Sequence, residues 1–234
     1  MRKTIIFIFA LVLIGAGIFF YLYRGGELFE KMLVWKNVTE GVIEYEVTYP
    51  KLDPNSMIAA ALPDKAYMRF KNNNMITEMS AMMFNISYIS NQSNKSVAQT
   101  FTLFSKKNVS DISAADMKKL NGSYLSSIEE GTHTRQIAGF TCKEVIAKLQ
   151  TGESIRVYYT NDIGINNPNW SNPYTKIDGV LMDFQLESYG LSMHLKAKTL
   201  LPQKIEDSAF DIPADQQKIP FAELEAMLRA AVSN

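Results

Sequence analysis

The sequence predicts an α+β fold, an antiparallel sheet with a few packing helices, behind one N-terminal transmembrane helix. Three observations carry this prediction. Positions 5–23 form an uninterrupted run of 19 uncharged, mostly apolar residues. From residue 41 onward, apolar and polar residues alternate in short segments separated by turn residues, as in strands with one buried face. The segment 220–232 repeats apolar residues at the spacing of one helical face.

Residues 1–24 are expected to form a membrane anchor. As a helix, 5–23 would span about 28 Å, close to the roughly 30 Å hydrocarbon core of a bilayer. The run exceeds a signal-peptide core, no small-residue cleavage site precedes Arg24, and no cysteine follows it to accept a lipoprotein acyl chain. We therefore expect an uncleaved single-pass anchor, then a juxtamembrane linker over 25–40. Basic residues nearly balance across the anchor, so charge alone leaves its orientation open.

Net charge and cysteine content narrow the function classes. Three of the 24 basic residues lie at the anchor, which leaves 21 against 24 acidic residues and a net charge of −3. Nucleic-acid binding needs a basic surface that displaces counterions from phosphates, so no nucleic-acid partner is expected. The single cysteine precludes an intramolecular disulfide, and no Cys/His spacing typical of a metal site occurs.

The first half of the predicted domain, 41–234, is a strand meander. In 41–49, apolar side chains alternate with Glu44 and Glu46, so the two carboxylates share a solvated face. Pro54 and Pro63 bound a short helix over 54–62. Asparagine-rich turns, which tolerate left-handed backbone, separate the strands that follow. These strands are expected at 65–71, 75–81, 84–90 and 96–104.

The second half continues the sheet behind a helix at 111–121, where Ser113 and Asp116 resemble a capping box. Between strands, residues 161–178 are too rich in Asn and Pro for regular structure and are expected to pack as an irregular loop. A C-terminal helix over 220–232 should lie on the sheet. Strands are expected at 124–130, 134–149 with an interruption at Gly139, 153–160, 180–189, 191–201 and 203–207.

Five short motifs resemble a known family. They are a G-x-I-x-Y strand at 41–45, a hairpin after Pro63, an I-x-G-[FY]-x-C-K strand at 137–143, a Y-T-x-D-I segment at 159–163 and a G-x-L-M/I strand from Gly179. Over residues 38–207 the chain resembles the GLPGLI-type family of uncharacterised envelope proteins and its sister domains. It departs from that family at 178–183, where the eponymous proline is missing, and in its expected uncleaved anchor.

The resemblance implies a fold and a location. The fold would be similar to that of the outer-membrane lipoprotein carriers, in which a strongly curved antiparallel sheet, an incomplete β-barrel, encloses an apolar hollow closed by helices. The location would be the inner membrane, spanned once by 5–23, with the C-terminal domain in the periplasm.

Candidate chemical groups are few. Cys142 lies in a predicted strand and is expected to be a buried structural residue, because free cysteine behaves as a small hydrophobe. His133 and His194 are the only histidines, and His194 falls among lysines on a face expected to be solvated. No motif of the common hydrolases, zinc proteases or nucleotide-binding proteins occurs. We therefore assign no catalytic residue, metal ligand or cofactor and do not expect an enzyme.

Methionine, aromatic and aliphatic side chains on the apolar faces of predicted strands form the candidate ligand-binding set. Methionine is flexible and polarizable, so it can line a cavity that accepts lipids of varying shape. The same side chains would fill a solid core equally well, and the sequence leaves both interpretations open. The set comprises Ile43, Tyr45, Met68, Phe70, Met79, Phe101, Met182, Phe184, Met193 and Leu195.

Two function hypotheses follow from the sequence. The first is a non-enzymatic, membrane-anchored periplasmic domain that binds or relays an apolar ligand, a lipid or a lipoprotein acyl chain. The second is a structural or interaction module that docks another envelope protein through a sheet edge or through the loop around Trp170. The ligand's identity and the oligomeric state are not predictable from the sequence.

Overall fold

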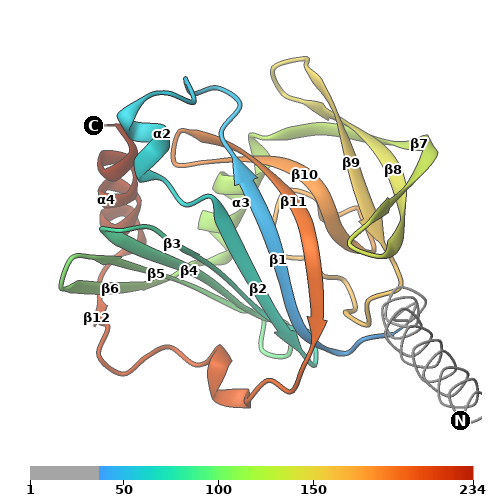
Figure 1. The fold of residues 1–234 in the computed structure, drawn as a ribbon. Helices are drawn as coiled ribbons and strands as arrows, with labels where there is room; N and C mark the ends of the chain where they lie inside the picture. The colour runs from blue at the N-terminus through green and yellow to red at the C-terminus, as the bar shows by residue number, and fades with distance from the viewer. Residues whose placement is uncertain (1–36, 234) are drawn as a thin grey trace, which may run out of the picture. The chain divides into compact units, whose positions relative to one another are not determined.

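The computed structural model describes residues 37–233, which form a mostly-β domain (Figure 1). The strands, in chain order, are β1 (Glu40–Thr48), β2 (Lys65–Lys71), β3 (Asn74–Ser80), β4 (Phe84–Asn91), β5 (Ser96–Leu103), β6 (Lys106–Asp111), β7 (Leu125–Ile137), β8 (Phe140–Leu149), β9 (Ser154–Thr160), β10 (Val180–Ser188), β11 (Leu191–Pro202) and β12 (Gln217–Lys218). The helices of this part of the chain are α2 (Met57–Ala61), α3 (Ala114–Gly122), α4 (Phe221–Ser233) and the 3-10 turn η1 (Asp207–Phe210).

All 12 strands belong to one sheet, with the order β12-β6-β5-β4-β3-β2-β1-β11-β10-β9-β8-β7. Two antiparallel meanders, β1 to β6 and β7 to β11, join where β1 pairs with β11 near the middle of the sheet, as Figure 1 shows. The short β12 pairs in parallel with β6. The predicted antiparallel sheet with a few packing helices is therefore confirmed, although the class is mostly-β rather than α+β.

The sheet is neither closed nor strongly curled. Strands β6 and β7 are consecutive in the sequence, but they lie at opposite ends of the strand order. The connection between them contains α3. The edge strands β12 and β7 therefore do not pair with each other. The strongly curved, incomplete barrel that the resemblance implies is thus corrected to an open sheet.

The two faces of the sheet are covered differently. The inner face, defined as the one on which α4 packs, carries one apolar cluster that joins Val97 and Phe101 of β5 to Leu224 of α4. A larger cluster on β1, β2 and β8 to β11 continues the core. On the outer face, a smaller cluster that includes Ile89 is covered by Phe210 of η1.

Several predicted local features are confirmed. The Ser113 hydroxyl accepts a hydrogen bond from the Asp116 backbone N–H at 3.1 Å, and the Asp116 side chain completes the capping box of α3. Asn72 and Asn73 have φ values of 50° and 66° at the β2–β3 turn, as the asparagine-rich hairpin predicts. Residues 161–178 contain no helix or named strand, as predicted. This loop packs on the domain through its own Tyr174, whose side chain is fully buried.

Other predicted elements are wrong. The segment 134–149 is not one interrupted strand but the end of β7, a turn and β8, because Ala138 and Gly139 both have positive φ, at 50° and 85°, as a tight hairpin turn requires. Residues 203–207 form no strand. Strands β6 and β12 were not predicted, and the helix expected over 54–62 is limited to α2.

The predicted anchor, 1–24, and residues 25–36 of the predicted linker, 25–40, lie outside the described residues. Within 37–233, no helix is both long and apolar enough to cross a membrane. Val38, placed in the linker by the sequence analysis, is buried and forms a parallel bridge with Ile163. The folded domain therefore includes the end of the predicted linker.

Candidate functional site

A cavity of about 260 Å³ lies against the inner face of the sheet. Inner-face side chains of β1 to β5, β10 and β11 line it, and α3, α4 and the loop 168–173 contribute the opposite side. It exceeds the roughly 150 Å³ of an engineered apolar cavity that binds benzene and approaches the roughly 300 Å³ lower bound of ordinary ligand pockets. The space is therefore large enough for a small apolar ligand.

Several lining side chains on β3 and β4 are only half-buried although they point to the inner face. Cross-strand pairing sets Met79 opposite Ile86 and Ile86 opposite Phe101, so these three side chains share that face. Met79 and Ile86 are half-buried, as is Phe84 at the start of β4. They border the cavity instead of packing fully against neighbouring side chains.

Seven of the ten predicted ligand-binding residues line the cavity. They are Tyr45, Met68, Met79, Phe101, Phe184, Met193 and Leu195. They come from β1, β2, β3, β5, β10 and β11, so the sheet brings together side chains that are far apart in the sequence.

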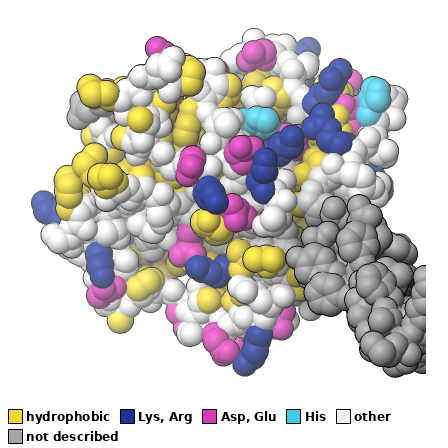
Figure 2. Space-filling view, in the orientation of Figure 1, with side chains coloured by type: hydrophobic (Ala, Val, Ile, Leu, Met, Phe, Trp, Pro, Cys, Tyr) yellow, Lys and Arg dark blue, Asp and Glu magenta, His cyan; other side chains and the backbone are white. Residues whose placement is uncertain are grey.

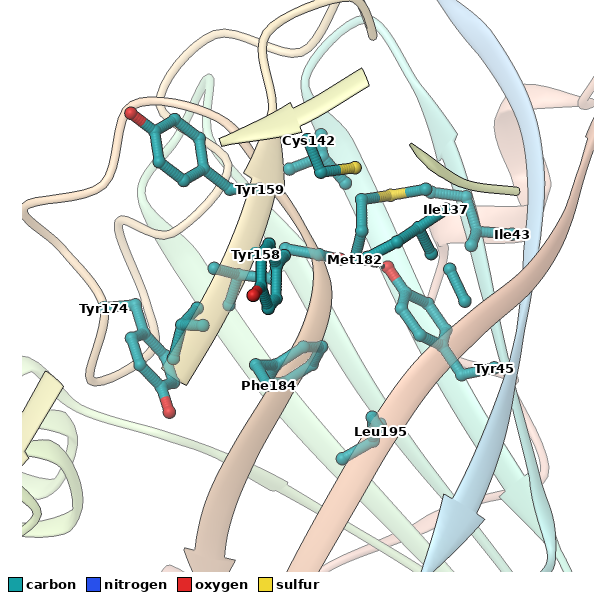
Figure 3. Packing of buried hydrophobic residues seen from close by; sticks show 14 of the residues in the cluster. Ile43, Tyr45, Ile137, Cys142, Tyr158, Tyr159, Tyr174, Met182, Phe184 and Leu195 are labelled. Carbon is teal, nitrogen blue, oxygen red and sulfur yellow. Dashed lines mark hydrogen bonds between the residues drawn. The ribbon is translucent and has the colours of Figure 1, made fainter. Parts of the chain in front are cut away.

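The other three predicted residues, Ile43, Phe70 and Met182, do not line the cavity. Each is fully buried in the larger core cluster. Figure 3 shows Met182 beside Ile43 and Ile137, in a region where β8 and β9 side chains fill the inner face. For these three residues the second interpretation holds: they fill a solid core, because other side chains occupy the inner face at their end of the sheet.

Lining residues of two kinds are absent from the predicted set. Phe84, Ile86 and Tyr88 alternate along β4, and this period-2 pattern was a sufficient signal for them. The helix and loop residues carried no such signal, because their approach to the cavity depends on how those segments pack on the sheet. They include Leu62, Pro63, Leu120, Asn121, Asn172, Leu228 and Ala231.

Four tyrosines of the lining direct their hydroxyl groups to protein acceptors. Tyr45 donates to the Leu181 carbonyl at 2.9 Å, Tyr49 to the Pro63 carbonyl at 2.7 Å and Tyr88 to the Ser171 carbonyl at 2.8 Å, while Tyr189 donates to Gln99 Oε1. Burial raises the pKa of Tyr88 to about 12 and raises the pKa of Tyr45 further. These phenols therefore stay neutral near neutral pH, and their hydroxyl groups are already engaged.

Charge is nearly absent from the cavity wall. Among the described residues that line it, Glu187 is the one ionisable side chain other than the tyrosines. Its carboxylate is half-exposed and pairs with Lys51 Nζ at 3.1 Å. The cavity thus offers apolar surface and a few neutral polar groups.

Cys142 is a core residue, as predicted. Its side chain is fully buried, and Sγ contacts the Phe140 carbonyl at 3.6 Å. Burial raises the pKa of the thiol to about 12, so the nucleophilic thiolate is strongly disfavoured at neutral pH. The described partners of His133 lie on the outer face and do not include this thiol.

Both histidines belong to a polar cluster on the outer face of β7 to β11. Glu144, almost fully buried, accepts from His133 Nδ1 at 2.9 Å and from the Tyr158 hydroxyl at 3.1 Å. Asp183 pairs with Arg135 at 2.9 Å and with His194 Nε2 at 2.6 Å. Figure 2 shows histidine side chains (cyan) among acidic and basic ones on this face.

The polar cluster shows that the prediction of a solvated His194 is wrong. His194 is not a freely solvated side chain, because it is bound to the buried Asp183. The register of β7 shifts between Glu130 and Thr134, and a Cβ on Gly131 would lie only 2.6 Å from Glu144 Cγ. A glycine there lets the irregular part of β7 lie close over the buried carboxylate. Within 37–233, no three His, Cys, Asp or Glu side chains are arranged to hold a metal ion.

Neither a protein-family model nor a curated protein sequence matches this chain. The resemblance to GLPGLI-type envelope proteins therefore remains a prediction from the five motifs.

Proposed function

We propose that this chain is a membrane-anchored periplasmic protein whose domain binds or relays an apolar ligand, a lipid or a lipoprotein acyl chain, without catalysing a reaction. The observation that carries the proposal is the cavity of about 260 Å³, bordered by half-buried apolar side chains of the inner face. Protein interiors are normally close-packed, with few voids larger than a water molecule. An apolar space of this size is therefore a candidate binding site.

The size of the cavity sets the strength of binding that it could provide. At roughly 30 Å³ for each water-sized unit, a volume near 260 Å³ holds about eight methylene groups. Burying each methylene contributes about 0.8 kcal/mol, which sums to about 6 kcal/mol before the costs of association. That corresponds to dissociation constants on the order of tens of micromolar or weaker. Reversible binding of this strength suits a protein that passes its ligand on.

The location, an inner-membrane anchor with the domain in the periplasm, is also part of the proposal. The membrane anchor rests on the apolar run 5–23, and the periplasmic side rests on the resemblance carried by the five sequence motifs. The proposal does not depend on a curved half-barrel, because α3 and α4 cover the cavity on the inner face of the open sheet.

Photo-crosslinking in membranes tests this function on the full chain. A benzophenone amino acid replaces Ile86, which borders the cavity, or Tyr67, which is exposed on the outer face of β2. Cells are fed an alkyne-tagged fatty acid so that acyl lipids can be detected. We expect lipid adducts at position 86 and far fewer at position 67. Equal labelling at the two positions would overturn the proposal.

A second candidate function, docking of another envelope protein, is favoured by an exposed apolar patch. This tip patch consists of Met82 and Met83 in the β3–β4 turn and Phe104 in the β5–β6 turn. The Phe104 backbone N–H donates to the Met83 carbonyl at 3.0 Å, so the two turns are adjacent. Such patches often mark interaction sites. By contrast, Trp170 packs against the α4 cluster instead of projecting as an anchor.

A crosslinker at Phe104 distinguishes the two functions. If docking is the function, one protein adduct forms at position 104 and disappears in the Met83→Ser variant, and no lipid adduct forms at position 86. A lipid adduct at position 86 without a protein adduct at 104 would exclude the docking function.

A further inference from the structure

One buried side-chain hydroxyl in the cavity wall, that of Ser90, has no hydrogen-bond partner among the described residues. Ser90 lies on β4 and is 2% exposed. The side chain lines the cavity. Buried hydroxyl groups in folded proteins are nearly always hydrogen-bonded, because water is lost without replacement otherwise. A ligand atom in the cavity is a natural partner for this hydroxyl.

Other neutral polar side chains lie near Ser90 on the same face. Cross-strand pairing sets Ser90 opposite Val97, so Gln99 is its diagonal neighbour on β5, at roughly 7 to 8 Å between backbone positions. Gln99 is almost fully buried and also lines the cavity. Its Oε1 accepts from Tyr189, which leaves the amide N–H groups as donors. This end of the cavity therefore provides hydrogen-bond donors.

The cavity wall on β4 itself is apolar toward the other end of the strand. Phe84 and Ile86 begin the strand, and six residues at roughly 3.4 Å each place Ser90 about 20 Å beyond Phe84. Along β4 the cavity wall therefore changes from the apolar side chains of Phe84 and Ile86 to the buried hydroxyl of Ser90. No Lys, Arg or His is among the described residues that line it, and Glu187 is acidic. A carboxylate or phosphate inside the cavity would lack a counter-charge, which makes its burial costly.

We propose that the ligand is a neutral acyl compound, an ester or amide, whose carbonyl oxygen accepts a hydrogen bond from Ser90. This inference rests on the proposed binding function and adds the chemical class of the ligand. The acyl chain would lie on the apolar region along Phe84 and Ile86. A free fatty acid in its ionised form would be excluded.

Competition binding to the full chain in detergent-free peptidiscs tests the inference. The neutral dye N-phenyl-1-naphthylamine reports occupancy of the cavity, and methyl decanoate or decanoate at pH 8 displaces it. We expect methyl decanoate to bind at least about tenfold more tightly than decanoate. We expect Ser90→Ala to weaken the binding of methyl decanoate by about three- to tenfold, which corresponds to the loss of one ordinary hydrogen bond. The dye should bind both proteins equally.

Ser87→Ala is the matched control, because Ser87 lies on the same strand but points to the outer face. It should leave all three affinities unchanged. If the dye binds and Ser90→Ala does not change the affinity for methyl decanoate, the inference is wrong while the binding function stands. Equal affinities for methyl decanoate and decanoate would also overturn it. If neither the dye nor methyl decanoate binds, both the inference and the proposed function fail.

Discussion

The same substitution at two isoleucines should give opposite results, because one borders the cavity and the other lies in the filled core. Ile86 on β4 is half-buried at the cavity, whereas Ile43 on β1 is fully buried and paired with Met68 and Leu200. Replacing isoleucine by phenylalanine adds less than the roughly 30 Å³ of one water molecule. The cavity of about 260 Å³ accommodates that increase at Ile86. The core around Ile43 has no such space.

The expected magnitudes follow from this difference. Overpacking at Ile43 should cost about 1 to 3 kcal/mol of unfolding free energy. For a domain of this size, each kcal/mol shifts the melting temperature by about 2 to 4 °C, so Ile43→Phe should lower it by about 2 to 12 °C. Ile86→Phe should stay within about 0.5 kcal/mol of the wild type.

Thermal unfolding followed by near-ultraviolet circular dichroism, on the full chain in peptidiscs, measures both variants under one condition. Similar destabilisation by Ile86→Phe and Ile43→Phe would mean that the space beside Ile86 is filled in solution. The reasoning from the cavity would then be refuted.

Three further predictions concern the core, the outer face and a turn. Cys142 should not react with a thiol reagent at pH 8 until the protein is denatured, because burial raises its pKa to about 12; rapid labelling of the native protein, read by absorbance, would contradict its burial. The hydrogen bond from His133 lowers the pKa of Glu144 below its ordinary 4.5. The ionised carboxylate therefore contributes its full stabilisation of the fold above pH 4.5 and loses it as the pH falls through the lowered pKa. Glu144→Gln should therefore lower the melting temperature at pH 7 and reduce its acid dependence; an unchanged pH profile would disprove the assignment. Ala138→Asn should stabilise by about 1 kcal/mol, because alanine is disfavoured at a φ of 50°, and a lowered melting temperature would count against this reading of the turn.

Alternating apolar residues predicted most of the sheet because each strand has one inner and one outer face. The signal fails at β6, where the inner face carries Asn108 and Ser110 and an apolar side chain, Val109, points outward. It also fails at the turn of Ala138 and Gly139, since alanine has no turn preference and the sequence indicated only an interruption of one strand at Gly139, not a reversal of the chain. Residue pattern alone does not identify a turn that is formed by an uncommon residue.

The candidate site was predictable only in part for a similar reason. Alternation assigns a side chain to a face, and it did so for Met68 and Phe184, which border the cavity. Alternation does not show whether the inner face at a given position is covered by other side chains or borders a cavity. For this reason the predicted ligand-binding set also contained Ile43 and Met182, which lie in the core. Whether a position borders the cavity depends on where α3, α4 and the loop 168–173 pack. The polar cluster was missed because it joins residues such as Arg135 and Asp183 that lie on separate strands.

Native mass spectrometry of the full chain, compared with an Ile86→Trp variant that fills part of the cavity, shows directly whether the cavity holds an acyl lipid. Lipids around a membrane anchor would be common to both proteins, so they cancel in the comparison. We expect one additional acyl lipid on the wild type that is absent from the equally stable variant. The same lipid complement on both proteins would contradict the proposed function.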